Sequence, residues 1–281
     1  MHLTNVGPLW LRRYALAVSG CTLLLLIAGG LVTSNDAALS VPDWPTSWGS
    51  LFPPLQGGIR YEFAHRVLAL LATLMTIGLA LAMRTRLAWT ALLAVAAQAA
   101  LGGAGVLLAE PLWIAIAHAC LGQLQFGLVV AVTAQAFGAT PSLSRPLIFA
   151  LILAQTALGA AVRYGVIGLA AHLGGALVAT LYLMWVSLSL LMNNMDNPSV
   201  RRPAMLLLSL TFSQVFLGIA SYMARVVYVN APQPMPLLIF FTVAHVAFGS
   251  LVFGAAVLFT TLARPQQLPV SGGPVSGVVT A

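Results

Sequence analysis

Four histidines in apolar stretches share a local sequence, and their imidazoles are the side chains best suited to bind a cofactor. Each follows an alanine and has a small residue four positions later: His65, His118, His172 and His245. Two facing imidazoles in a helical bundle are typical axial ligands of haem iron. A small residue one turn away would leave room for a flat macrocycle. A hydrogen bond to a neighbouring helix is the alternative role for each ring. Four matched copies favour two haem sites, His65 with His118 and His172 with His245.

Other metals suit this set of residues less well. No cysteine or carboxylate completes a tetrahedral zinc site around each histidine pair. Copper would favour Met or Cys ligands, and the nine Met residues are scattered along the chain. The two cysteines, Cys21 and Cys120, lie inside apolar runs and predict neither a disulfide framework nor a redox pair.

One histidine has a carboxylate beside it, in the segment Glu-Phe-Ala-His-Arg at residues 62–66. Glu62 and His65 are three residues apart and would share a helix face. Glu62 is either a surface acid that a helix N-terminus favours or a proton-handling acid beside the first haem. Arg66 would pair with a haem propionate or with Glu62. No other histidine of the set has such an acid, so the asymmetry favours one reactive haem and one electron-transfer haem.

The elements that must position these rings are transmembrane helices. The chain has 281 residues, of which 60% are apolar and only 6% charged, against about 25% charged in a typical soluble domain. This composition excludes a soluble enzyme, a disordered protein and a nucleic-acid binder. A bilayer requires about 20 apolar residues per helix, and charge-poor runs of that length predict eight spans in an all-α integral membrane protein: 14–33, 62–83, 87–109, 112–137, 146–162, 167–192, 203–227 and 237–263.

The arginines predict the orientation of these spans in a bacterial-type cytoplasmic membrane. With both termini cytoplasmic, eight of the twelve basic residues fall on the inner side and four of the five acids on the outer side. All four histidines then lie in the outer half of the membrane. The remaining arginines are predicted near outer helix ends, where they do not contribute to the positive-inside pattern: Arg60, Arg66, Arg163 and Arg225. The outer segment 34–61, rich in Pro and aromatics, is either an interfacial belt or a lid over a site.

An internal repeat accompanies the histidines. The pattern Gln-x-x-Leu-Gly begins at Gln98, Gln155 and Gln214 on the third, fifth and seventh spans, and the first span keeps only a Gly-Gly at the similar place. Each of these helices precedes one that carries a histidine. The chain is therefore predicted to form four helix pairs in two pseudo-symmetric four-helix halves, 1–140 and 141–264, followed by a disordered tail, 265–281.

These residues resemble the haem A synthase family, membrane enzymes that oxidise haem O for cytochrome oxidases. The most specific parts are Gly-Gly-Leu-Val-Thr at 29–33, Pro-Asp-Trp-Pro at 42–45, the segment 62–66 and the four spaced histidines. The resemblance implies that His172 and His245 ligate haem b, while His65 and His118 face the substrate haem O with Glu62 as the essential acid. It further implies a haem O synthase and an electron donor as partners, and a homo-oligomer is compatible with it.

The chain departs from the family pattern in three places. Val41 and Ser47 stand near the positions of a cysteine pair that many bacterial members have, the loop after Arg163 is short, and His172 lacks a following arginine. Arg163 and Arg225 are the candidates to hold the haem b propionates instead. The rival functions are a non-catalytic di-haem electron carrier, which would not need Glu62, and a transporter of a hydrophobic ligand. A haem O synthase is disfavoured because this chain has three scattered Asp residues and no Asp-rich segment.

Overall fold

The computed structural model describes residues 6–141, 145–232 and 235–262, and its regular elements are eight α-helices. The predicted disordered tail lies outside these residues. All eight helices are long and apolar enough to span a membrane, which confirms the predicted number. Their bounds are α1 Leu9–Ser34, α2 Ile59–Met83, α3 Arg86–Leu107, α4 Leu112–Ala136, α5 Pro146–Arg163, α6 Leu169–Asn193, α7 Pro198–Val227 and α8 Pro236–Leu262.

The helices extend beyond the predicted apolar runs where arginines continue them. Arg12 and Arg13 lie inside the first turns of α1, and Arg201 and Arg202 lie inside those of α7. Long basic side chains reach the aqueous interface from such positions, so they do not interrupt a spanning helix. Within the bilayer every backbone polar group must pair internally, and a continuous helix achieves this.

Local sequence accounts for several helix ends. The Thr85 side chain accepts a hydrogen bond from the Ala88 amide at the start of α3, and Asn197 caps α7 through the Ser199 amide. Proline occupies the first turn of α5 and of α7, where its missing N–H costs nothing. These capping residues and prolines fix where α3, α5 and α7 begin, and hence where the loops before them end.

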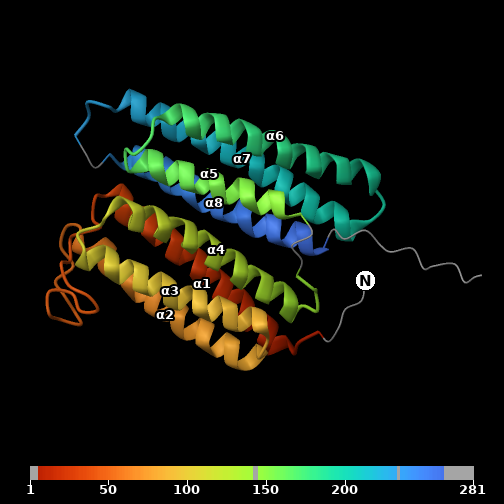
Figure 1. Ribbon diagram of the computed structural model, residues 1–281, viewed down its shortest axis with the longest axis horizontal. Coiled ribbons are helices and arrows are strands. Elements are labelled where there is room, and N and C mark those ends of the chain that lie inside the picture. The colour runs from red at the N-terminus through yellow and green to blue at the C-terminus, as the bar shows by residue number, and fades with distance from the viewer. Residues whose placement is uncertain (1–5, 142–144, 233–234, 263–281) are drawn as a thin grey trace, which may run out of the picture.

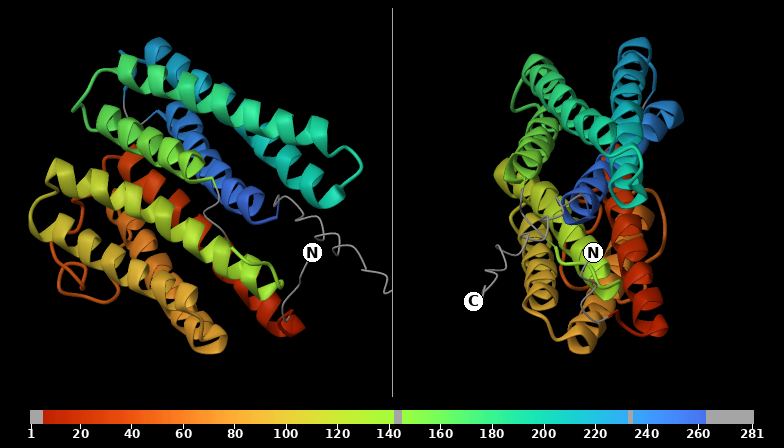
Figure 2. Two further views of the ribbon diagram at one scale, coloured as in Figure 1. Left: turned by 45° about the vertical axis from the view of Figure 1, so that its right-hand side comes forward. Right: turned by 90° about the vertical axis from the view of Figure 1, so that its right-hand side faces the viewer.

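The helices form two layers of four, α1–α4 and α5–α8 (Figures 1 and 2). Within each layer every helix contacts the next along the chain, and the last contacts the first. Between the layers α4 contacts α5 and α8, and α1 contacts α8. If α1–α4 are exchanged for α5–α8 in order, the same pairs of helices are in contact. Two pseudo-symmetric halves would require this. The first turn of α1 and the last turn of α8 lie at one end of the bundle, and the loop after α1 lies at the other.

A reciprocal contact between α4 and α8 lies at the centre of this arrangement. The Phe253 ring of α8 occupies the space where Gly127 of α4 would carry a Cβ, and a Cβ on Gly254 would lie 3.0 Å from Phe126. Each phenylalanine comes eight residues after the histidine of its own helix, and each glycine comes nine residues after it. The two helices therefore pack against each other through equivalent positions.

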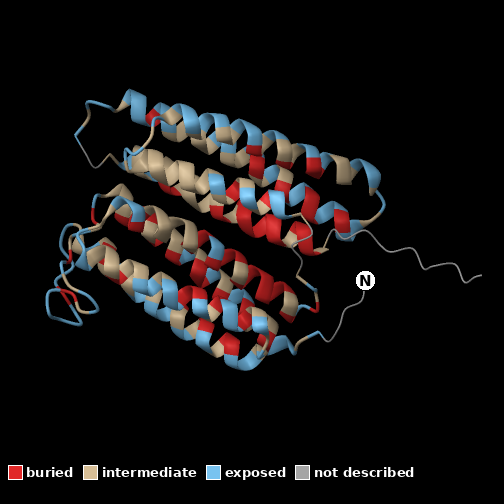
Figure 3. Ribbon diagram, in the orientation of Figure 1, coloured by how far each residue is buried: buried red, intermediate tan, exposed pale blue. Residues whose placement is uncertain are grey.

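Buried residues concentrate where the two layers meet, and the outward faces remain exposed (Figure 3). The main cluster joins Phe126, Phe253, Phe259 and Leu207 from helices of both halves. Large apolar side chains such as Trp185 and Phe216 are 64% and 69% exposed in the bare protein. A soluble protein rarely exposes such continuous apolar faces, and here they meet lipid. The protein is an integral membrane protein.

Candidate functional site

The four histidines are brought together in two pairs, one in each half. The rings of His65 on α2 and His118 on α4 have centroids 6.5 Å apart at an interplanar angle of 74°. The rings of His172 on α6 and His245 on α8 have centroids 6.4 Å apart at 85°. A metal bound at about 2 Å from one nitrogen of each ring would separate the centroids by about 6 Å. Both pairs therefore have the spacing of two ligands to one metal.

Each ring rests against a glycine of the preceding helix. A Cβ on Gly29, Gly102, Gly159 or Gly218 would lie 3.3, 3.2, 3.0 or 3.0 Å from the Cε1 atom of His65, His118, His172 or His245, respectively. A Cβ at any of these positions would crowd the ring, so glycine favours this close approach of ring to backbone. The imidazole thus packs against the last residue of the Gln-x-x-Leu-Gly repeat, and against Gly29 on α1. We call these four glycines the seat glycines.

The glutamine of the repeat contacts the same histidine. Gln98 Nε2 donates to the His118 carbonyl at 2.8 Å, and Gln155 Nε2 donates to the His172 carbonyl at 2.9 Å. The expectation that the small residue after each histidine makes room for a macrocycle is wrong at two positions. A Cβ on Gly122 or Gly249 would lie 3.1 or 3.0 Å from the glutamine amide nitrogen, so these glycines accommodate the amide.

The buried side of three rings faces backbone. The Nδ1 atoms of His65, His118 and His245 are buried without a well-aligned hydrogen-bond partner among the described residues. Backbone groups one turn before the seat glycines interact with these rings, that of Leu25 with His65, that of Gln98 with His118 and that of Gln214 with His245. A metal-binding histidine usually directs one N–H to a backbone carbonyl and binds the metal through the other nitrogen. His65 and His118 are therefore placed to use Nε2 as the ligand atom, whereas Nε2 of His245 lies 3.4 Å from the Gln214 amide nitrogen.

Glu62 lies in the first turn of α2 and is only 4% exposed, so it is not a surface acid. Its Oε1 lies 2.6 Å from Nη2 of Arg66, and its Oε2 accepts a hydrogen bond from the Val41 amide at 2.8 Å. Arg66 Nη1 donates to the carbonyls of Asp43 and Thr46 at 2.8 and 2.7 Å. Of the two partners predicted for Arg66, the structure provides Glu62, and the guanidinium is further engaged by the outer loop.

The loop between α1 and α2, residues 35–58, which we call the outer loop after its predicted side, folds onto the end of the N-terminal half. The Trp44 ring packs on Gly103, next to the seat of His118, and a Cβ there would lie 2.9 Å from it. Asp43 accepts hydrogen bonds from the Thr46 hydroxyl and from the amides of Trp48 and Gly49, and these bonds lower the Asp43 pKa to about 2. The loop is therefore internally ordered and covers the end of the site, as a lid would.

A second set of outer contacts joins the two halves. Arg163 at the end of α5 donates to the Thr33 carbonyl of α1 and lies 3.9 Å from Asp36. The Tyr164 hydroxyl donates to Glu110, at 3.4 Å, in the loop before α4. Burial raises the pKa of both side chains, that of Tyr164 to about 12. Arg163 is thus engaged by protein groups in the described residues.

Arg225, the other arginine predicted to hold a propionate, is exposed in the last turn of α7 and has no hydrogen bond or ion pair within the described residues. No group of three or more potential metal-binding side chains occurs in this part of the chain.

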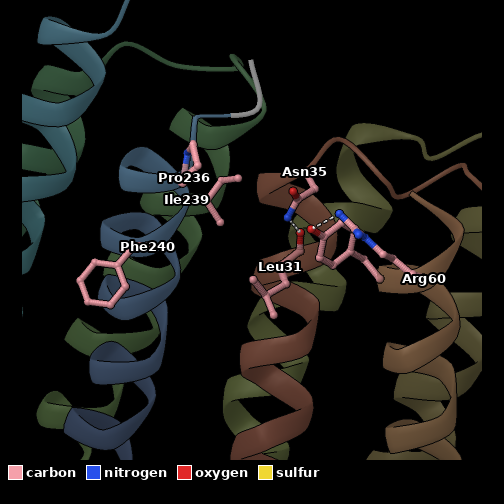
Figure 4. A pocket seen from close by; sticks show the side chains of 7 residues that line it. Leu31, Asn35, Arg60, Pro236, Ile239 and Phe240 are labelled. Carbon is pink, nitrogen blue, oxygen red and sulfur yellow. Dashed lines mark hydrogen bonds between the residues drawn. The ribbon is translucent and has the colours of Figure 1, made fainter. Parts of the chain in front are cut away.

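A cavity of about 380 Å³ lies where the end of α1 meets the first turns of α2 and α8 (Figure 4). Its lining includes Asn35, Arg60 and Phe240, and none of the four histidines. Arg60 donates to the Tyr61 hydroxyl at 2.9 Å and lies over the Tyr61 ring. In the sequence, Arg60 stood out because it is predicted to lie on the outer side, whereas most of the arginines are predicted to lie on the inner side. The cavity is separate from both histidine pairs.

Comparison with known proteins finds similarity in the N-terminal half. Residues 7–130 match the COX15-CtaA family, described as cytochrome oxidase assembly protein. A protein of Methylobacterium radiotolerans named heme A synthase is 36% identical over 139 residues, which are 42% of this chain and 38% of that protein. A Methylobacterium sp. strain 4-46 protein of the same name is 34% identical over 149 residues, or 44% of this chain and 41% of its own length. The chain thus spans less than half the length of these relatives, and its N-terminal half is similar to cytochrome oxidase assembly proteins.

Proposed function

We propose that this protein is a haem A synthase, which oxidises a ring methyl group of haem O to a formyl group. The observation that carries the proposal is the pair His65 and His118 with the buried Glu62 one turn from His65, all in the half that matches the family. The net change, methyl plus water to formyl, releases four protons and four electrons. An electron acceptor, and a supply of oxygen atoms, must therefore come from outside the chain.

The two histidine pairs are assigned different haems. His65 and His118 hold the substrate haem O, and His172 and His245 hold a resident haem b. The matched centroid spacings and glycine seats support two sites of one kind, and the single carboxylate supports a reactive role for the first. A bound haem b would supply one-electron redox chemistry at the second site.

The chain's own residues bind and orient the substrate and handle its protons. The glycine seats and glutamine amides fix the imidazoles, and the apolar helix faces keep water from the macrocycle. Glu62, buried and hydrogen-bonded at both oxygens, holds or passes a proton at the edge of the site. Arg66 positions that carboxylate and the loop above it. Arg225, whose guanidinium is exposed, is the remaining candidate for a propionate of haem b.

We further propose that both termini are cytoplasmic and that the two sites lie toward the outer side of the membrane. The arginine distribution supports this orientation. A haem O synthase is the class of enzyme that must supply the substrate, and a membrane electron carrier is the partner for the redox steps. Nothing in the helix packing opposes a homo-oligomer.

The haem content of the protein tests this function. The protein is expressed with and without a haem O synthase, and its extracted haems are separated into B, O and A. Haem A is expected only with the synthase, and haem B in both preparations. His172→Ala and His245→Ala should remove the low-spin haem B signal while the helices still insert. Haem B alone in every preparation would refute the synthase and favour the di-haem electron carrier.

A further inference from the structure

The four helix pairs follow one plan, and α1 departs from it at two positions of the repeat, Leu25 in place of Gln and Ala28 in place of Leu. In three pairs a glutamine lies one turn before the seat glycine: Gln98, Gln155 and Gln214. On α1 the same position, four residues before Gly29, is Leu25. A directional polar side chain is therefore replaced by an apolar one next to His65 alone.

Each glutamine is positioned to hold its histidine. Gln98 and Gln155 donate to the carbonyls of their histidines, and the Gln155 amide nitrogen also lies 3.0 Å from Nδ1 of His172. The Gln214 amide nitrogen lies 3.4 Å from the His245 ring. A hydrogen bond in a low-dielectric interior fixes distance and direction at once. The His118 and His172 turns are therefore held to the neighbouring helix by a hydrogen bond to their backbone, whereas Gln214 contacts its histidine at Nε2 of the ring.

Leu25 makes contacts of a different kind. It is 7% exposed and packs in a small cluster with Cys21 and Ala72, against which Leu68 and Ala69 also lie. In the described residues no side chain donates a hydrogen bond to His65 or to its carbonyl. Dispersion contacts tolerate small rotations that would break a hydrogen bond. On the α1 side, the His65 turn therefore lacks the side-chain hydrogen bond that a glutamine supplies in the other pairs.

What does fix the His65 turn is the outer loop. Glu62 and Arg66 flank His65 on α2, and both bind backbone groups of residues 41–46. Their mutual contact of 2.6 Å makes the two side chains and the loop one hydrogen-bonded unit. A displacement of the loop would therefore be transmitted to the His65 turn, whereas the other three turns would keep their glutamine bonds.

We propose that His65 is the releasable ring of the four, and that the outer loop controls its release through Arg66 and Glu62. This inference rests on the proposed binding of haem O between His65 and His118. A released His65 would leave its side of the site open to a small ligand, and His118 would be the residue that keeps the haem in place. The substitution of Leu25 for glutamine is the feature that permits this.

Ring mobility can be measured without activity. In the full chain in lipid nanodiscs without added haem, hydrogen–deuterium exchange at each histidine Cε1–H is followed by mass spectrometry. Leu25→Gln should slow exchange at His65 about fivefold, the factor supplied by one hydrogen bond of ordinary strength. The matched Gln98→Leu should accelerate exchange at His118 and leave His65 unchanged. Each ring is compared with itself, so intrinsic differences between the histidines cancel.

Ligand access is measured on the haem-loaded protein by cyanide titration of its absorbance spectrum. One of the two haems should bind cyanide, and Leu25→Gln should weaken that binding about fivefold. Arg66→Gln should strengthen it, because the loop no longer fixes the His65 turn. The proposal is overturned if Leu25→Gln changes neither exchange nor cyanide binding while Gln98→Leu releases His118. Absence of haem from the first site would refute the proposed function instead, and the exchange result would still report which ring is mobile.

Discussion

A methyl group added to a histidine seat should weaken haem binding in the half that carries the seat. In Gly159→Ala the new Cβ would lie 3.0 Å from Cε1 and 3.5 Å from Nδ1 of His172. Carbon atoms prefer separations of about 3.5–4.0 Å, so the ring must retreat by roughly 0.5–1 Å. Functional sites tolerate displacements of about 0.5 Å. Loss of ligand orientation of this kind lowers metal affinity about 10-fold to 100-fold.

The matched control is Gly174→Ala on α6, because a Cβ there meets nothing within 4 Å. Both variants gain about 1 kcal/mol of helix propensity, so their difference isolates the contact with the ring. The assay is titration of the purified protein with haem, followed by low-spin absorbance. Gly159→Ala should bind the second haem at least about tenfold more weakly than Gly174→Ala. Equal affinities in the two variants would show that the glycine does not act as a seat for a ligating ring.

Two further predictions concern the acid and the orientation. Glu62→Gln should retain haem at the first site but lower haem A formation about 100-fold, with haem O accumulating, because a general acid or base contributes a factor of about 10²–10⁴ to the rate. Haem A is measured by extraction, and a near-normal amount would show that Glu62 does not handle protons. Reporter fusions after Arg84 and Arg201 should be cytoplasmic and one at Glu110 external, and the reverse pattern would place every histidine in the inner half of the membrane.

Two features of the fold and the site were predictable from the sequence because they depend on local pattern. Apolar runs of about 20 residues must become helices in lipid, where backbone groups can pair only within the segment. The repeated Ala-His motif followed by a small residue indicated four equivalent positions, since equal local sequence at equal depth in a helix places side chains alike. The pairing of His65 with His118 and of His172 with His245 followed from the repeat of helix pairs.

Only the tertiary structure decided the partners of the polar groups. Arg66 had two candidate partners in the sequence, and it binds Glu62 and the outer loop because the loop folds back over α2. Gly122 was expected to face a macrocycle, and it faces the Gln98 amide because α3 and α4 cross there. The contact of Phe253 with Gly127 joins residues 126 positions apart in the chain. Such contacts depend on the rotation and crossing of whole helices, which local periodicity does not specify.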